Sequence, residues 1–142
     1  DILHRHPRPK GNRHLYVKRN GDLVADPFDH ELIFVVHESD GMVVVTGCSH
    51  HGVLNMVETA ATRFPDTPIK AVVGGFHLIG LPLFDTMTSN REEVRAIATT
   101  LLDRVAGTVF TGHCTGRKGT AALAAVMGDR LRTVHTGSVV EV

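Results

Sequence analysis

Short apolar runs rich in β-branched residues recur along the chain from residue 32 onward and predict six strands. They lie at residues 32–37, 42–47, 69–74, 107–112, 131–135 and 138–142. The first two runs are joined by the turn sequence Glu38-Ser39-Asp40-Gly41, which predicts an antiparallel hairpin. The third run is predicted to be a buried strand.

Three further segments carry apolar residues at helical spacing. They are residues 52–64, a segment that begins after Ser89, and the Ala-rich residues 120–127, which Gly128 is expected to end. Ser89 and Glu92 have the spacing of a capping box, so Ser89 is the predicted N-cap. Residues 76–88 are expected to form a loop. The element order is therefore ββαβαβαββ, an α/β layout in which amphipathic helices cover apolar strands.

The first 22 residues differ from the rest in charge and in local pattern. They hold six basic and two acidic residues, a net charge of +4, together with several Pro and Gly residues. This composition predicts a basic, irregular segment at 1–22 that precedes a folded part at 23–142. A solvated linker is the simpler interpretation, and a cationic loop that lies over an anionic substrate is the alternative.

Composition excludes several classes of protein. With 142 residues, the chain has the length of one domain. Its 15 basic residues equal its 15 acidic residues, so no overall charge favours nucleic acid, and no apolar run approaches the ~20 residues that span a bilayer. Two cysteines make no disulfide scaffold, which predicts a reduced, cytoplasmic setting. Ten histidines, with one Tyr and no Trp, point instead towards metal or acid–base chemistry.

Ligand-type side chains follow three of the predicted strands. Cys48 and His50 follow the second strand, His77 follows the third, and His113 and Cys114 follow the fourth. A glycine precedes each group and permits sharp turns, and the carboxyl ends of strands are where ligands collect in open α/β sheets. Imidazole and thiolate are ligands that zinc prefers. The pattern predicts a metal site in which His50 and His113 are the main ligands and Cys48 and His77 are further candidates.

Other interpretations of the same residues remain open. The neighbouring Cys and His residues suggest a cysteine nucleophile with a general base, although adjacent side chains seldom point at each other. Gly-rich turns near Gly52 and Lys118 suggest phosphate binding, but no GxxxxGK[ST] or GxGxxG motif is present. His51 is a candidate supporting residue. Carboxylates in the segment 26–32 either orient a histidine or, as the simpler interpretation, cap a turn as exposed acids.

Four motifs occur together in this chain. They are Asp29-His30-Glu31-Leu32, Thr46-Gly47-Cys48-Ser49-His50-His51-Gly52, Gly74-Gly75-Phe76-His77-Leu78 and Gly112-His113-Cys114-Thr115-Gly116. This set resembles the metallo-β-lactamase superfamily, in particular its metal-dependent hydrolases related to dihydropterin–aminobenzene-phosphate synthases, over essentially the whole chain. The resemblance implies an αββα sandwich of two similar halves, with 23–142 as the C-terminal half and a dinuclear metal site at the seam. The HxHxDH cluster that the family carries in its other half is absent from this sequence.

The resemblance also implies roles for individual residues. His50 and His113 match metal ligands, and Cys48 falls where many members place a bridging Asp or Cys. His77 matches a ligand or a substrate contact. In a complete site, His77 or a carboxylate from the other half is the expected catalytic proton donor to the leaving group. The implied cofactor is a divalent metal, most simply zinc, with two ions in the complete site. The implied activity is hydrolysis of a phosphate or ester substrate through a metal-activated water.

Two alternatives to a hydrolase accompany this prediction. One is a pterin-related transferase of the same fold, and the other is a non-catalytic half-domain used for assembly. In each case the expected partner is a separate N-terminal half or a second copy of the chain, and the isolated chain is expected to be poorly active. No nucleic-acid or membrane partner is predicted.

Overall fold

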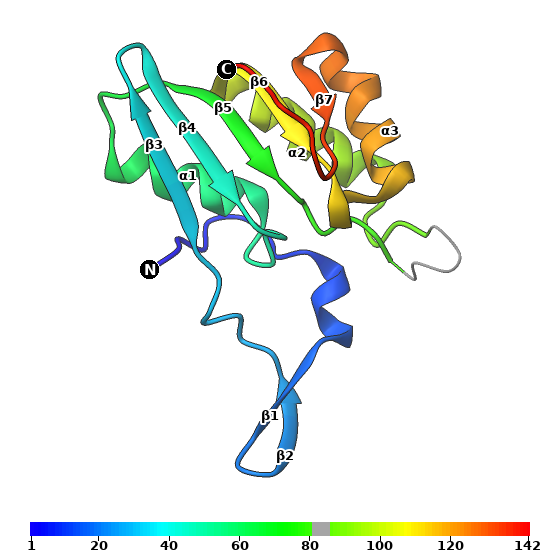
Figure 1. The fold of residues 1–142 in the computed structure, drawn as a ribbon. Helices are drawn as coiled ribbons and strands as arrows, with labels where there is room; N and C mark the ends of the chain where they lie inside the picture. Colours follow the sequence, from blue (N-terminus) through cyan, green and yellow to red (C-terminus); the bar gives the residue numbers. More distant parts are fainter. Residues whose placement is uncertain (81–85) are drawn as a thin grey trace.

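A computed structural model describes residues 1–80 and 86–142, and a five-stranded sheet forms its centre (Figure 1). The strands, in spatial order, are β3 (Ile33–Glu38), β4 (Gly41–Thr46), β5 (Ile69–Gly74), β6 (Val105–Thr111) and β7 (Leu131–Thr133). β3 and β4 form the predicted antiparallel hairpin, whereas β4, β5, β6 and β7 pair in parallel. The carboxyl ends of four strands therefore lie along one edge of the sheet.

Helices cover one face of this sheet (Figure 1). They are α1 (Val53–Arg63), α2 (Arg91–Arg104) and α3 (Gly116–Met127), with short 3-10 turns η3 (His113–Thr115) and η4 (Gly128–Arg130) at the ends of α3. Val44, Val72 and Val109 of the sheet are buried against them, together with Leu101 and Leu123 of the helices. In the part of the chain that the structure describes, no helix is long and apolar enough to cross a membrane.

The opposite face of the sheet has a smaller apolar cluster. Val43, Ala71 and Phe110 are buried there, with Val134 packed against them. Phe34 pairs with Val45 on the same face, and its side chain is 62% exposed. The apolar face thus continues onto β3, where this chain leaves it open to solvent.

The N-terminal segment is more ordered than its sequence predicts. It contains η1 (Lys10–His14) and the antiparallel hairpin of β1 (Tyr16–Arg19) and β2 (Asp22–Ala25), which projects away from the main sheet (Figure 1). The prediction of an irregular segment at 1–22 is therefore wrong at these elements, and the hairpin crosses the expected boundary after residue 22.

Contacts with α1 hold the start of the chain against the helical layer. The backbone N–H groups of Arg5 and His6 both donate to Asn55 Oδ1 at 2.8 Å, and the N–H of Leu3 donates to Thr59 Oγ1 at 2.9 Å. Because Asn55 is fully buried, these residues pack against the body of the molecule and do not form a solvated linker.

Several predicted boundaries need correction. The N-cap of α2 is Asn90, not Ser89, because Asn90 Oδ1 accepts from the Glu93 N–H at 2.8 Å while Glu93 Oε2 accepts from the Asn90 N–H at 3.0 Å. α3 begins at Gly116 instead of residue 120. Residues 138–142 form no strand and are mostly exposed. The predicted loop at 76–88 includes residues 81–85, which lie outside the described residues, and an isolated bridge joins Ile79 to Met87 beside them.

Candidate metal centre

Three loops meet at the carboxyl edge of the sheet, as the sequence predicts. The Gly75 N–H, just after β5, donates to the Gly47 carbonyl, just after β4, at 2.8 Å. A Cβ atom on Gly75 would lie 2.6 Å from Cys114 Sγ, in the loop after β6. Glycine is thus required at residue 75 because backbone and sulfur approach too closely for any side chain.

Cys48, His113 and Cys114 form a group that could hold a metal ion. One candidate ligand atom from each lies within 4.8 Å of the others. Tetrahedral zinc ligands are about 3.3–3.8 Å apart, as follows from bonds of about 2.0–2.3 Å, so small side-chain movements bring this group to the required spacing. Two of the four predicted site residues, Cys48 and His113, are therefore brought together, and Cys114 joins them.

A local backbone conformation makes the pairing of adjacent residues feasible. His113 has a φ of 49°, in the left-handed region that non-glycine residues seldom adopt. The sharp turn lets the side chains of His113 and Cys114 belong to one group even though they are neighbours in sequence. Such strained conformations are typical of functional sites.

Cys114 is buried where the three loops meet. Its sulfur accepts a hydrogen bond from the His77 N–H at 3.3 Å and donates one to the Cys48 carbonyl at 3.5 Å. Burial raises the pKa of the Cys114 thiol to about 12, and the nearby Cys48 adds to this effect. Without a bound cation this sulfur is therefore a protonated thiol at neutral pH, and a metal would have to displace its proton.

His50 and His77 form a second, neighbouring pair. Their ring centroids are 4.3 Å apart with an interplanar angle of 58°, and neither residue belongs to the group around Cys48. His77 Nδ1 is buried and has no hydrogen-bond partner among the described residues. Burial lowers the pKa of His77 to about 4, and His50 adds to the effect, so the ring is neutral at pH 7. Burial also lowers the pKa of His50. Neutral imidazole is the form that binds metals.

Glu31 supports the loop that carries Cys48 and His50. Its carboxylate accepts from the backbone N–H groups of His50 at 2.6 Å and His51 at 2.7 Å, and it pairs with His51 Nδ1 at 2.8 Å. The Glu31 side chain is only 6% exposed. The interpretation of the segment 26–32 as exposed acids is thus wrong for Glu31. It is right for Asp29, which forms an exposed ion pair with Arg19.

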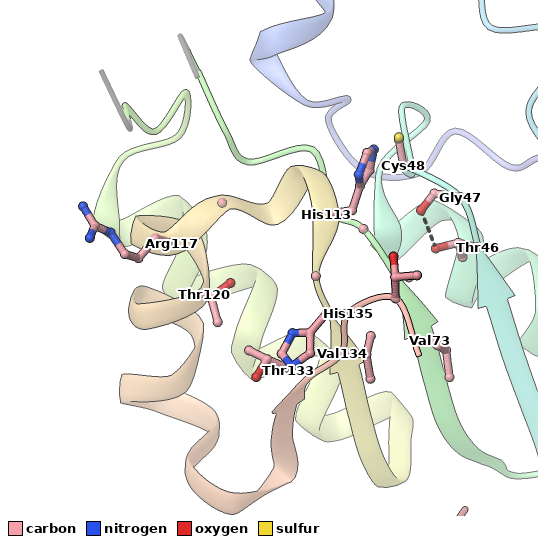
Figure 2. Close-up of a pocket in the computed structure, with 15 residues that line it drawn as sticks. Thr46, Gly47, Cys48, Val73, His113, Arg117, Thr120, Thr133, Val134 and His135 are labelled. Atoms are coloured by element: carbon pink, nitrogen blue, oxygen red, sulfur yellow. Dashed lines mark hydrogen bonds between the residues drawn. The ribbon is translucent and has the colours of Figure 1, made fainter. Parts of the chain in front are cut away.

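A pocket of about 750 Å³ opens beside the metal-binding group. Cys48 and His113 line one side of it, and Arg117, Thr120 and His135 line another (Figure 2). Several lining residues are glycines of the three loops. The pocket therefore places the hydroxyl group of Thr120 and the ring of His135 near the candidate ligands Cys48 and His113.

Sequence reasoning missed Cys114 as a ligand and Glu31 as a buried carboxylate. The signal for Cys114 was its position next to the candidate ligand His113. The positive φ of His113, which brings the Cys114 side chain into the site, cannot be seen in the sequence. For Glu31 the signal was its place at the end of a polar segment, directly before the predicted strand at 32–37, and this place does not reveal burial.

One solved structure and two curated proteins are similar to this chain. No protein-family model matches the chain. The crystal structure of Tm1679, described as a metal-dependent hydrolase of the β-lactamase superfamily, superposes with a TM-score of 0.83 and 32% sequence identity, over 99% of this chain and 51% of that chain.

Two curated proteins of Methanocaldococcus jannaschii are also similar. The 7,8-dihydropterin-6-methyl-4-(β-D-ribofuranosyl)-aminobenzene-5′-phosphate synthase is 28% identical over 127 residues, which is 89% of this chain and 40% of that protein. The uncharacterized protein MJ0448 is 33% identical over 63 residues, 44% of this chain and 22% of that protein. The chain thus spans about half the length, or less, of the relatives it matches. These similarities confirm the resemblance found in the sequence: the chain is related to the metallo-β-lactamase superfamily and has the α/β fold of about half of one of its metal-dependent hydrolases.

Proposed function

We propose that this chain forms part of a metal-dependent hydrolase that acts on a phosphate or ester substrate. The observation that carries the proposal is the group of Cys48, His113 and Cys114 at the rim of a pocket of about 750 Å³. A mixed thiolate and imidazole ligand set suits zinc better than calcium or magnesium, which prefer oxygen. Zinc is therefore the cofactor that we propose.

The residues present fit a metal ion. They combine three soft or borderline donors with an unpartnered buried nitrogen at His77 Nδ1. A bound divalent metal supplies Lewis acidity, which polarises a substrate oxygen and lowers the pKa of water. The chain's own part is to bind the ion through Cys48, His113 and Cys114, and to extend the site through His50.

His77 is the proposed proton-transfer residue. Its ring is neutral at pH 7, and its Nδ1 is unpartnered among the described residues. The neutral ring has a lone pair that can accept a proton in the first transfer, and the low pKa makes the protonated ring a ready proton donor afterwards. Donation to a leaving group, the role implied by the resemblance, would follow in a second step.

Residues outside these 142 are proposed to complete the site. The resemblance implies two metal ions, and the described residues contain one group of three candidate ligands. The HxHxDH sequence is not present in the chain. We propose that an N-terminal half of the fold supplies these ligands and covers the open apolar face that includes Phe34. The isolated chain is accordingly expected to turn over substrate poorly.

Metal stoichiometry tests the proposal directly. The purified chain, stripped with a chelator and reloaded with zinc, should retain about one ion when measured by mass spectrometry. His113→Ala and Cys48→Ser should lose it, whereas His135→Ala, a change of the same kind on the far side of the pocket, should keep it. Equal zinc retention in His113→Ala, Cys48→Ser and the parent chain would overturn the proposed ligand set.

A transferase is the second candidate, and one finding favours it. The synthase relative aligns with 89% of this chain. Hydrolysis and transfer differ in the fate of the bond that is broken, because only hydrolysis places water oxygen in the product. Reaction of the completed protein in ¹⁸O-labelled water distinguishes them: label in the released phosphate or acid supports hydrolysis. A purely assembling half-domain, the third candidate, would tolerate both chelation and His113→Ala without loss of stability.

A further inference from the structure

The side chain of Asn12 contacts His50 at two points. Asn12 Nδ2 donates to the His50 carbonyl at 2.6 Å, and Asn12 Oδ1 lies 3.0 Å from His50 Nδ1. Asn12 belongs to η1, 38 residues before His50 in the chain. The N-terminal segment therefore reaches into the candidate metal centre.

These two contacts together define which nitrogen of His50 carries hydrogen. A carbonyl oxygen can only accept, so the Asn12 NH₂ group must face it, which leaves the amide oxygen facing the ring. That oxygen also only accepts, so His50 Nδ1 must be the donor. A neutral imidazole has one N–H, and His50 Nε2 is then left with its lone pair free.

Phe28 fixes the plane of the same ring. The Phe28 and His50 rings are stacked, with centroids 4.3 Å apart and planes within 8° of parallel. The centroid of the His77 ring also lies 4.3 Å from that of His50. Phe28 is 3% exposed and has a φ of 61°, a strained conformation for an aromatic residue. Its own N–H is held by Asp26 Oδ1 at 2.8 Å.

We infer that Asn12 and Phe28 are positioning residues that hold His50 as the Nδ1–H tautomer and leave Nε2 as its free ligand or base atom. Phe28 sets the plane of the ring, and Asn12 sets its rotation within that plane. The use of Nε2 for a metal rests on the proposed function, whereas the tautomer itself follows from the contacts alone. The N-terminal segment is thereby a part of the site and not an appendage to it.

The tautomer can be measured without metal or substrate. Long-range ¹H–¹⁵N correlation spectra of the ¹⁵N-labelled, metal-free chain, recorded where the ring is neutral, distinguish protonated from unprotonated ring nitrogens. We expect a protonated Nδ1 for His50, assigned by its loss in His50→Gln. Exposed His135 should show the Nε2–H form that predominates in free histidine. A protonated Nε2 at His50 in the parent chain would overturn the inference.

Variants at residue 12 separate positioning from simple structural support. Asn12→Leu removes the acceptor, so the Nδ1–H preference should be lost and zinc affinity should fall about 10- to 100-fold. Asn12→Asp keeps an acceptor for His50 Nδ1 and should retain the Nδ1–H tautomer, but it loses the donor to the His50 carbonyl and should therefore lower the stability of the chain. Asn20→Gly, in the β1–β2 turn of the same segment, is the control and should change neither the tautomer nor the zinc affinity.

Two outcomes distinguish this inference from the proposed function. If His50 is the Nδ1–H tautomer but the parent chain binds no zinc, the positioning stands and the ligand role of His50 fails. If zinc binds and Asn12→Leu alters neither the tautomer nor the affinity, the positioning role fails while the proposed metal site stands.

Discussion

The two faces of the central sheet differ in how completely this chain covers them. On the helical face, Val72, Val94 and Leu101 are fully buried. On the opposite face, Phe34 is 62% exposed and Val36 is 37% exposed, although both continue the apolar cluster around Val43. Exposed apolar patches of this kind mark interaction surfaces. The comparison teaches that one face owes its stability to this chain alone, while the other is suited to a partner.

The largest expected effect comes from the helical face. Leu101→Ala removes a fully buried side chain in the last turn of α2. The resulting cavity should lower the free energy of unfolding by about 2–5 kcal/mol, measured by urea denaturation. Phe34→Ala, on the open face, is the matched truncation and should cost far less. Equal losses for the two variants would break the comparison, because they would mean that Phe34 is buried in solution.

The next largest effect is expected at the carboxyl edge of the sheet, where Glu31 supports the loop that carries His50. Glu31→Gln replaces a carboxylate that accepts from three donors on His50 and His51 with an amide that has a single acceptor oxygen. At least one buried donor loses its partner, so the free energy of unfolding should fall by about 1–3 kcal/mol. Asp29→Asn removes an exposed acid nearby and is the control. An unchanged free energy of unfolding in Glu31→Gln would mean that these hydrogen bonds do not stabilise the loop.

A smaller effect tests the start of the helical layer. Asn90→Ala removes the observed cap of α2 and should cost about 1 kcal/mol in thermal or urea unfolding. Ser89→Ala, at the neighbouring residue that the sequence favoured, should cost little. A larger loss of stability in Ser89→Ala than in Asn90→Ala would mean that Ser89 is the N-cap, as the sequence predicts.

The smallest effect on stability is expected on the open face, with a clear effect on association. Phe34→Ser makes an exposed apolar residue polar and should leave the free energy of unfolding within about 0.5 kcal/mol of the parent. If the isolated chain self-associates through this face, sedimentation velocity should show less self-association in the variant. A parent chain that remains monomeric at high concentration would argue that the face needs a different partner and does not bind itself.

Most of the strands and helices could be predicted, because the patterns that indicate them involve residues that are close together in the sequence. β5 matches the predicted strand at 69–74, since an apolar run bounded by Pro68 and Gly74 has few other conformations. The cap of α2 could not be assigned from sequence, because Ser89 and Asn90 are each followed by Glu three residues later. Two overlapping capping boxes are present, and only tertiary packing selects one. The predicted strand at 138–142 failed because apolar residues without a neighbouring strand gain no ladder of hydrogen bonds.

The candidate site was predictable only in part, for a related reason. Cys48 and His113 could be found because each follows a strand whose end must lie at the same edge. Asn12 could not, since its contact with His50 depends on how an N-terminal segment packs on distant loops. Local pattern thus predicts residues that strands carry to the edge, but not those that approach it from outside.

The separation of the ligands along the chain has a consequence for folding. Cys48 and Cys114 are 66 residues apart, and the parallel pairing of β4, β5 and β6 must form before their sulfurs meet. Such nonlocal pairing forms slowly, and a metal ion finds no preformed site in the unfolded chain. The proposed zinc ion, where it binds, should therefore act mainly after the folding barrier, so that it prolongs the lifetime of the native state and hardly accelerates its formation. The cation would thus slow the unfolding of a sheet that has already assembled.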